Sequence, residues 1–205
     1  MQTTREIFSF SKKNTHVYLI KNNSIKSTDV DELQLEDDEI RKFVAFQSEK
    51  RKKEFIAIRI IVNKILPGKK IKYKSTGAPY FEDHSFSLSI THTKEYVAIG
   101  ISSEKRVGID IETVQEKIIH LGVKFMHPIE IKSVNEIDLA KYYTRYWCAK
   151  EALYKWSNIT GLSFQNDLPI YNQNDIWSGR SLKISNEIIP LEMIEIGEHI
   201  LCFTY

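Results

Sequence analysis

The spacing of apolar residues predicts a long helix in the first part of the chain. Between Ser48, a suitable N-cap, and Pro67-Gly68, which ends the run, apolar side chains recur at helical spacing. These residues are Phe55, Ile58, Val62 and Ile65. An acidic stretch over residues 31–39 leads into this helix and into a shorter helical stretch before it.

The residues after this helix have the patterns of β-strands. Over residues 86–91, apolar residues alternate with Ser and Thr, as on a half-buried strand. Residues 96–101 are almost wholly apolar, as in a central strand, and residues 108–114 are predicted to form another strand. Residues 73–81, which contain Gly and Pro, are expected to form a loop or a strand.

A second long helix is predicted over residues 136–156. Ser133 and Asn135 are its candidate N-caps, and Gly161 lies just beyond its end. Residues 115–134 give weaker signals, and the tail from residue 163 to 205 contains short strand-like runs.

The order of a long helix and strands therefore occurs twice. We predict an α+β fold of two similar halves in a pseudo-twofold arrangement, each a long helix packed on a mainly antiparallel sheet. A short polar break near residue 105 divides the chain into an N-terminal half (1–105) and a C-terminal half (106–205).

Composition indicates a soluble globular protein. The 205 residues are 42% hydrophobic and 27% charged, which suits one large domain or two small ones without structural disulfides. Cys148 and Cys202 are expected to be free thiols, and no zinc-ligand spacing occurs. The N-terminus resembles no signal peptide, and the most apolar segment, 56–66, is interrupted by Arg, Asn and Lys. We therefore expect a cytoplasmic protein that does not interact with membranes.

Charge is distributed unevenly along the chain. Residues 41–74 carry twelve Lys or Arg and two acids, a net charge of +10, whereas the remaining residues sum to −8. This window indicates either an anion-binding surface or a solvated helix face.

Three short clusters contain candidate functional residues. In Gly108-Ile109-Asp110-Ile111-Glu112, strand periodicity places Asp110 and Glu112 on one face, about 6.5–7 Å apart. Two carboxylates at this spacing can share a hard cation such as Mg²⁺, although an ordinary amphipathic strand has the same pattern.

The second cluster lies on the second predicted helix and the third at a strand end. Trp147, Glu151 and Lys155 form one helical stripe, beside which lies Lys150; a core Trp with a routine i,i+4 ion pair would give the same pattern. The third cluster, Ser89-Ile-Thr-His-Thr93, combines hydroxyls with an imidazole, which suits phosphate binding or an ordinary turn.

Taken together and in this order, the clusters resemble the motifs of the 4′-phosphopantetheinyl transferase superfamily. Length and spacing resemble the single-chain, two-halved type that activates peptide and polyketide synthetases. The resemblance covers residues 48–162. It implies transfer of phosphopantetheine from coenzyme A to a serine of an acyl or peptidyl carrier protein, with holo-acyl-carrier-protein synthase activity. It also implies release of adenosine 3′,5′-bisphosphate.

The resemblance also implies roles for individual residues. Asp110, Glu112 and Glu151 match the metal-binding acids, for Mg²⁺ or Mn²⁺; Glu151, directly or through a metal-bound water, and Lys155 are the catalytic candidates. The matching coenzyme A contacts are Arg59, Gly77, Pro79, Thr91, His92, Lys150 and Lys155. Because the first half would supply the basic helix and the second the acids, the cleft would lie within one chain, and we expect a monomer.

Two departures from the family pattern and three alternatives remain. Ala78 stands where the family often has a lysine, for which Lys74 or another nearby lysine could substitute, and Thr91-His92-Thr93 replaces the family's Ser-His-Ser. A phosphotransferase would be expected to have a phosphate-binding glycine loop or kinase motif, which the sequence lacks. The sequence contains no recognisable nucleic-acid-binding motif. A non-catalytic coenzyme A or carrier-binding module would be expected to have lost one of the three acids.

Overall fold

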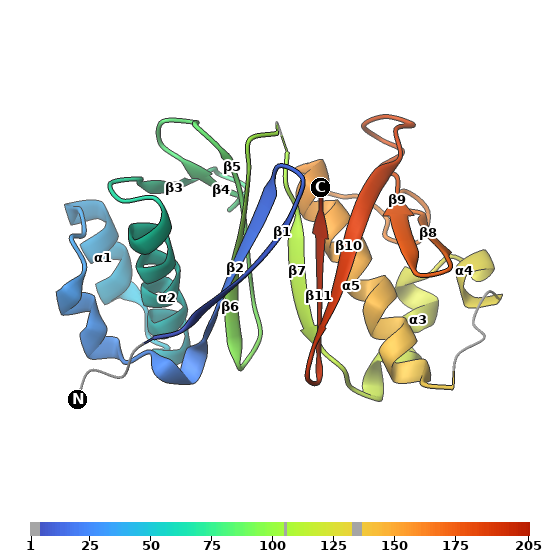
Figure 1. Cartoon of the computed structure of the whole chain (residues 1–205), viewed down its shortest axis with the longest axis horizontal. Coiled ribbons are helices and arrows are strands. Elements are labelled where there is room, and N and C mark those ends of the chain that lie inside the picture. The colour runs from blue at the N-terminus through green and yellow to red at the C-terminus, as the bar shows by residue number, and fades with distance from the viewer. Residues whose placement is uncertain (1–4, 105, 133–136) are drawn as a thin grey trace.

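The computed structural model describes residues 5–104, 106–132 and 137–205. Two antiparallel sheets lie side by side in the middle of the molecule, and the helices cover their outer faces (Figure 1). The elements up to β6 form one side and those from β7 onward form the other. This arrangement confirms the predicted α+β fold.

The first sheet has the strand order β1-β2-β6-β5, and β3 pairs separately with β4. The elements of this part are β1 (Ile7–Lys12), β2 (Thr15–Lys21), the 3-10 turns η1 (Asn22–Ser24) and η2 (Ser27–Glu32), α1 (Asp37–Ala45), α2 (Glu49–Ile65), β3 (Ile71–Tyr73), β4 (Pro79–Phe81), β5 (Ser87–His92) and β6 (Tyr96–Ser102). The β1–β2 hairpin was not among the predicted elements. Phe8 and Phe10 of β1 alternate with Ser9 and Ser11 as on a strand, and they lie on its partly buried side.

The second sheet has the order β7-β11-β10-β9-β8. Its part of the chain contains β7 (Ile109–Thr113), α3 (Lys117–Phe125), α4 (Pro128–Lys132), α5 (Leu139–Ser157), β8 (Ile170–Gln173), β9 (Ile176–Gly179), β10 (Ile189–Ile196) and β11 (His199–Thr204). The tail thus supplies four of the five strands, while the weak-signal segment forms α3 and α4. None of the described helices has the length and apolar character needed to cross a membrane.

The ends of α5 differ in detail from the prediction. Ser133 and Asn135, the candidate caps, lie outside the described residues, and Asp138 caps the helix by accepting a hydrogen bond from the Lys141 amide at 3.0 Å. The helix ends at Ser157, because Asn158 adopts a left-handed conformation with φ of 53°.

Three apolar layers hold the molecule together. One lies between α2 and the first sheet, and another between α5 and the second sheet. The third joins the two sheets and consists of side chains from β2, β6, β7, β11 and the segment just before β7: Val17, Leu19, Tyr96, Ala98, Val107, Ile109, Ile111, Leu201 and Phe203. β6 is buried along its whole length because its two faces serve two of these layers.

Two hydroxyl groups link the sheets at the edge where β5 meets β7. Ser89 Oγ accepts a hydrogen bond from the Ile109 amide at 3.2 Å, and Thr91 Oγ1 accepts one from the Ile111 amide at 3.3 Å. These side chains satisfy amides on the edge of β7, which would otherwise be buried without a partner. The strand bearing Asp110 and Glu112 is therefore fixed against the first sheet.

Gly108 gives a test of how closely β7 packs on α5. A Cβ at this position would lie 1.9 Å from the Ala152 carbonyl oxygen and 2.6 Å from the Trp156 amide nitrogen. Because backbone atoms must move to accept it, we expect Gly108→Ala to lower the free energy of unfolding by about 3 kcal/mol or more in urea denaturation. At Gly161 a Cβ would have no atom within 4 Å, and only the positive φ of +78° is unfavourable for alanine. Gly161→Ala should therefore lower the free energy of unfolding by about 1 kcal/mol. Equal losses for the two variants would contradict this close packing.

Candidate active site

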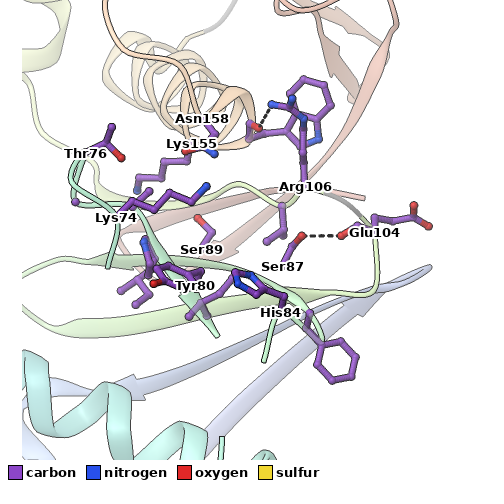
Figure 2. A pocket seen from close by; sticks show the side chains of 18 of the residues that line it. Lys74, Thr76, Tyr80, His84, Ser87, Ser89, Glu104, Arg106, Lys155 and Asn158 are labelled. Carbon is purple, nitrogen blue, oxygen red and sulfur yellow. Dashed lines mark hydrogen bonds between the residues drawn. The ribbon is translucent and has the colours of Figure 1, made fainter. Parts of the chain in front are cut away.

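A cleft of about 870 Å³ lies where the β3–β4 pair, β5 and the C-terminal end of α5 meet. Lys74, Arg106 and Lys155 are among its lining residues, which places three cations around one space (Figure 2). Gly77 and Pro79, two of the predicted coenzyme A contacts, also line it. The cleft is of a size typical of small-molecule sites and carries positive charge, so it suits an anionic ligand.

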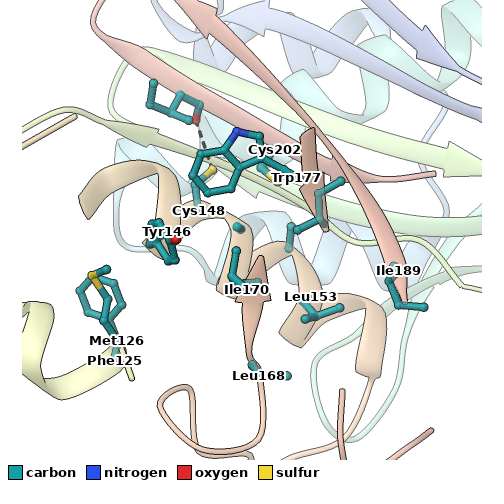
Figure 3. Packing of buried hydrophobic residues seen from close by; sticks show 14 of the residues in the cluster. Phe125, Met126, Tyr146, Cys148, Leu153, Leu168, Ile170, Trp177, Ile189 and Cys202 are labelled. Carbon is teal, nitrogen blue, oxygen red and sulfur yellow. Dashed lines mark hydrogen bonds between the residues drawn. The ribbon is translucent and has the colours of Figure 1, made fainter. Parts of the chain in front are cut away.

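Helix α5 is held in place by its apolar face. Cys148 and Leu153 are fully buried against side chains of the second sheet such as Trp177 (Figure 3). Cys148 Sγ also lies 3.2 Å from the Asp110 carbonyl oxygen and 3.3 Å from that of Ile200. Cys148 and Cys202 are both free, as predicted, and the structure shows that both are buried. This packing fixes α5, and with it Glu151 and Lys155, relative to β7.

Asp110 lies at the centre of the site. It is 4% exposed, and its Oδ1 accepts hydrogen bonds from Lys155 Nζ at 2.7 Å and from Thr91 Oγ1 at 2.9 Å. Its Oδ2 is buried and has no hydrogen-bond partner within the described part of the chain. Burial opposes the charge of Lys155, but Asp110 and Glu151 outweigh it and raise the pKa of this lysine. One carboxylate oxygen is therefore neutralised, and the other is left without a partner.

Glu112 and Glu151 face the same region from β7 and α5. Glu112 Oε1 accepts a hydrogen bond from Trp147 Nε1 at 3.0 Å. Burial and the nearby charge of Asp110 raise the pKa of Glu112. Burial and the same charge raise the pKa of Glu151 to about 7, with a smaller contribution from Glu112. Asp110 is thus close enough to oppose the ionisation of both glutamates.

The oxygen atoms of these acids are suitable ligands for a hard cation whose remaining ligands come from a bound substrate. Within the described ranges, no group of three or more His, Cys, Asp or Glu side chains lies close enough to hold a metal ion by itself. However, a cation would pair with the unpartnered Asp110 Oδ2 and would relieve the repulsion that raises the pKa values of Glu112 and Glu151. Mg²⁺ commonly takes one or two protein carboxylates and completes its shell with water and substrate phosphates. The donor set is compatible with that mode of binding.

Thr91 and His92, both predicted to contact coenzyme A, are placed differently from each other. Thr91 is 5% exposed, and its hydroxyl is engaged with Asp110 and the Ile111 amide, so its observed role is to hold β7. His92 is partly exposed, and its Nε2 lies 3.0 Å from Arg51 Nη1. Burial lowers the pKa of His92, while Glu54 opposes this effect and Arg51 adds to it.

Lys150 is not available to coenzyme A, contrary to the prediction from the motif. Its side chain is fully buried, and its three donors bond to Glu130 Oε1 at 2.9 Å, the Phe164 carbonyl at 2.9 Å and the Leu168 carbonyl at 2.7 Å. Burial lowers its pKa, and the charge of Glu130 partly offsets this. The lysine therefore ties α4 and the segment after α5 to the helix.

Arg59 is also placed away from the predicted coenzyme A site. It is 5% exposed, its guanidinium bonds to Glu39 at 3.0–3.1 Å, and it lies over the Phe55 ring at 3.5 Å. It borders a separate, smaller pocket next to α1 rather than the cleft. The helical spacing could not distinguish a residue facing α1 from one facing the cleft.

Much of the charge of the basic window is balanced locally. Lys70 and Lys72 pair with Glu36, Lys72 also lies 3.1 Å from Asp38, and Lys69 pairs with Asp83. The acidic stretch before the helix thus neutralises part of the surface that the charge count suggested for anion binding. Lys74, by contrast, lines the cleft, as expected for a substitute for the lysine missing at position 78.

Several cleft residues escaped the sequence analysis. Arg106 donates a hydrogen bond to the Ser157 carbonyl at 2.6 Å and so caps the end of α5 while lining the cleft. Tyr80 and His84 stack with ring centroids 5.2 Å apart on another wall. Only Arg106 had a sequence signal, because it belongs to the polar break before the Gly108 strand.

The buried Lys150–Glu130 pair predicts a large effect on stability. Lys150→Met leaves the buried Glu130 carboxylate without its counterion, so we expect unfolding in urea to show a loss of about 3–5 kcal/mol. The matched control is Lys183→Met, because Lys183 is 63% exposed and lies 3.6 Å from Asp167. This control should change stability by less than about 1 kcal/mol. A Lys150→Met protein of unchanged stability would contradict the structural role.

The raised pKa of Glu151 predicts a pH-dependent effect in metal-free protein. The pKa is about 7 in the folded state against 4.5 ordinarily, so the folded protein binds the proton more tightly and loses stability as pH rises through this range. Glu151→Gln removes that loss. We expect this variant to be more stable than the parent by about 1–2 kcal/mol at pH 8, with the difference vanishing near pH 4. Glu187→Gln, at an exposed acid, should show no such pH dependence; a parallel response of both variants would refute the assignment.

Comparison with known proteins supports an assignment to a family. Residues 106–194 match the family model of the 4′-phosphopantetheinyl transferase superfamily. A protein of Synechocystis sp., provisionally named as a 4′-phosphopantetheinyl transferase, is 23% identical over 137 residues, which cover 59% of this chain and 56% of that protein. The chain thus spans just over half the length of this curated relative. With its three motifs and its two-sheet α+β fold, the chain is similar to the 4′-phosphopantetheinyl transferase superfamily, most clearly over residues 106–194.

Proposed function

We propose that this protein transfers 4′-phosphopantetheine from coenzyme A to a serine of an acyl or peptidyl carrier protein. The serine hydroxyl attacks the β-phosphorus of coenzyme A, and adenosine 3′,5′-bisphosphate leaves. The observation that carries this proposal is the Lys155–Asp110 ion pair of 2.7 Å, because it joins the cationic cleft to the three acids. A pyrophosphate in the cleft would then lie beside both its charge-neutralising groups and a base.

The cleft residues would bind and orient coenzyme A. Lys74, Arg106 and Lys155 line one space and suit a ligand with a pyrophosphate and a phosphate monoester. Lys155 is held by Asp110 and by the Ile109 carbonyl at 3.0 Å, so its charge is fixed before a ligand arrives. Such fixed charge stabilises the negative charge that develops on the phosphoryl oxygens during substitution.

Asp110, Glu112 and Glu151 would hold the metal ion. Mg²⁺, or Mn²⁺ in its place, would supply Lewis-acid stabilisation of the phosphate oxygens when bound. Asp110 Oδ2 is buried and has no hydrogen-bond partner among the described residues, and the Trp147 indole orients Glu112 through its Oε1. The metal requirement is therefore part of the proposal and is tested with the activity.

Glu151 is the residue best suited to take the proton of the attacking serine. A carboxylate with an ordinary pKa is a weak base for a hydroxyl, but burial and Asp110 raise the pKa of Glu151 to about 7. A value near neutral pH leaves the group partly ionised and able to accept a proton, directly or through a water molecule. Lys155, on the same side of α5 one turn later, would neutralise the adjacent phosphate.

The two halves would have separate tasks within one chain. The N-terminal half (1–105) would contribute Lys74 and the β3–β4 wall to coenzyme A binding, and the C-terminal half (106–205) would contribute the acids and α5. Because residues from both halves line one cleft, a monomer would contain a complete site. We also propose a cytoplasmic location, where carrier proteins and coenzyme A are present.

The test is the intact mass of an apo carrier protein after incubation with the protein, coenzyme A and Mg²⁺. We expect the carrier to gain one phosphopantetheine, and EDTA to abolish the gain. Glu151→Gln should lower the rate by at least about 100-fold, whereas Glu187→Gln should leave it unchanged. Fatty-acid, polyketide and peptide-synthetase carriers are tested in parallel. No gain on any of them would overturn the transferase proposal, and retained coenzyme A binding would then favour a binding module.

A further inference from the structure

A polar residue with a left-handed backbone ends α5 at the edge of the cleft. Asn158 is the C-cap of this helix, with φ of 53°, and it lines the cleft together with Lys155 (Figure 2). Asparagine tolerates this conformation better than most residues, but glycine adopts it with less strain and is the usual residue at such a helix end. The turn alone therefore does not account for an amide side chain at this position.

The turn that carries Asn158 is held by contacts of the backbone and of the neighbouring residue. The Asn158 amide N–H donates to the Tyr154 carbonyl at 3.2 Å, and the Ser157 carbonyl accepts a hydrogen bond from Arg106 Nη1 at 2.6 Å. Ser157 is fully buried, and its Oγ lies 2.7 Å from Ser181 Oγ. These contacts fix the place of Asn158 at the cleft and leave its side chain free.

The side-chain amide of Asn158 has no partner in the part of the chain that the structure describes: it takes part in no hydrogen bond there. The residue is exposed where it lines the cleft. An uncharged amide offers one acceptor oxygen and two N–H donors. Phosphate groups are better served by the cations Lys155 and Arg106. Asn158 therefore suits a neutral part of the ligand that presents a donor beside an acceptor.

The other residues of the cleft indicate which neutral part that is. Lys74 and Arg106 line the same space, and they suit the nucleotide portion of coenzyme A, because the pantetheine arm carries no charge. Tyr80 and His84 also line it, with ring planes 7° apart, and parallel rings of this kind suit stacking with a flat base. Adenine presents its amino group next to a ring nitrogen, which is the pattern that an asparagine amide can match with two hydrogen bonds.

We propose that Asn158 is a specificity-determining residue that recognises the adenine base of coenzyme A. Its Oδ1 accepts a hydrogen bond from the adenine amino group, and its Nδ2 donates one to the adjacent ring nitrogen. This inference rests on the proposed function. It adds recognition of a neutral group, which the cations of the cleft cannot supply, because charge attracts the phosphates of any nucleotide equally.

The test pairs a change in the protein with a change in the ligand. The ligands are adenosine 3′,5′-bisphosphate and its analogue with unsubstituted purine in place of adenine, which lacks the amino group. Binding of each is measured by titration calorimetry to the full chain and to Asn158→Gly. In the parent, loss of the amino group should weaken binding about tenfold. In Asn158→Gly the same loss should weaken binding less than about twofold, because its acceptor is absent.

Asn174→Gly is the matched control. Asn174 has a similar φ of 51°, is exposed in the turn between β8 and β9, and does not line the cleft. This variant should bind both ligands as the parent does. Thermal unfolding should show both variants to be folded, since glycine is favoured at a positive φ. A turn at the end of α5 that is merely loosened by glycine would weaken binding of both ligands by the same factor.

The outcomes separate this inference from the proposed function. If the amino group costs the same factor in the parent and in Asn158→Gly, Asn158 does not recognise adenine. If Asn158→Gly weakens binding of coenzyme A but not of adenosine 3′,5′-bisphosphate, the amide contacts the pantetheine arm, and the assignment to the base is overturned. A parent protein that binds neither coenzyme A nor the bisphosphate would overturn the proposed function as well. Carrier modification by the parent, with unchanged ligand binding by Asn158→Gly, would refute this inference alone.

Discussion

The structure depends on burying the Asp110 carboxylate between two sheets. An isolated buried carboxylate is strongly unfavourable, and here Lys155 from α5 and Thr91 from β5 make it tolerable. The same bonds bring one helix and two strands together at a single atom, Oδ1. The other oxygen is left unpartnered. The Asp110 side chain thus holds elements of the fold together through Oδ1 and leaves Oδ2 available for chemistry.

The lysines of α5 show how the same residue type acquires opposite roles. Lys150 and Lys155 belong to one motif, but five positions on a helix separate their directions by more than a third of a turn. Lys150 points to α4, where Glu130 and two carbonyls occupy all its donors. Lys155 points to β7 and the cleft. Burial supports the fold in the first case, and partial exposure leaves the second beside the space for a ligand.

Charge along α1 and α2 is organised by pairing rather than by sum. Glu36 and Glu39 of the acidic stretch neutralise cations that a count of the basic window assigns to ligand binding. Glu54 does the reverse, since it introduces one negative charge among cations at the point where α2 meets His92. A net charge of +10 over this window therefore overstates the positive surface and does not locate it.

The sequence alone determined the α+β class, the strand that carries Asp110 and Glu112, and the helix that carries Glu151 and Lys155. Periodicity and motif order are local properties, and local propensity decides them. Only the tertiary structure decided that Lys150 and Arg59 are buried in ion pairs and that Arg106 lines the cleft. It also decided that Glu54 of α2 lies next to His92 of β5. These facts depend on which face each residue presents to elements distant in sequence. The spacing of residues within one helix or strand contains no information about that partner.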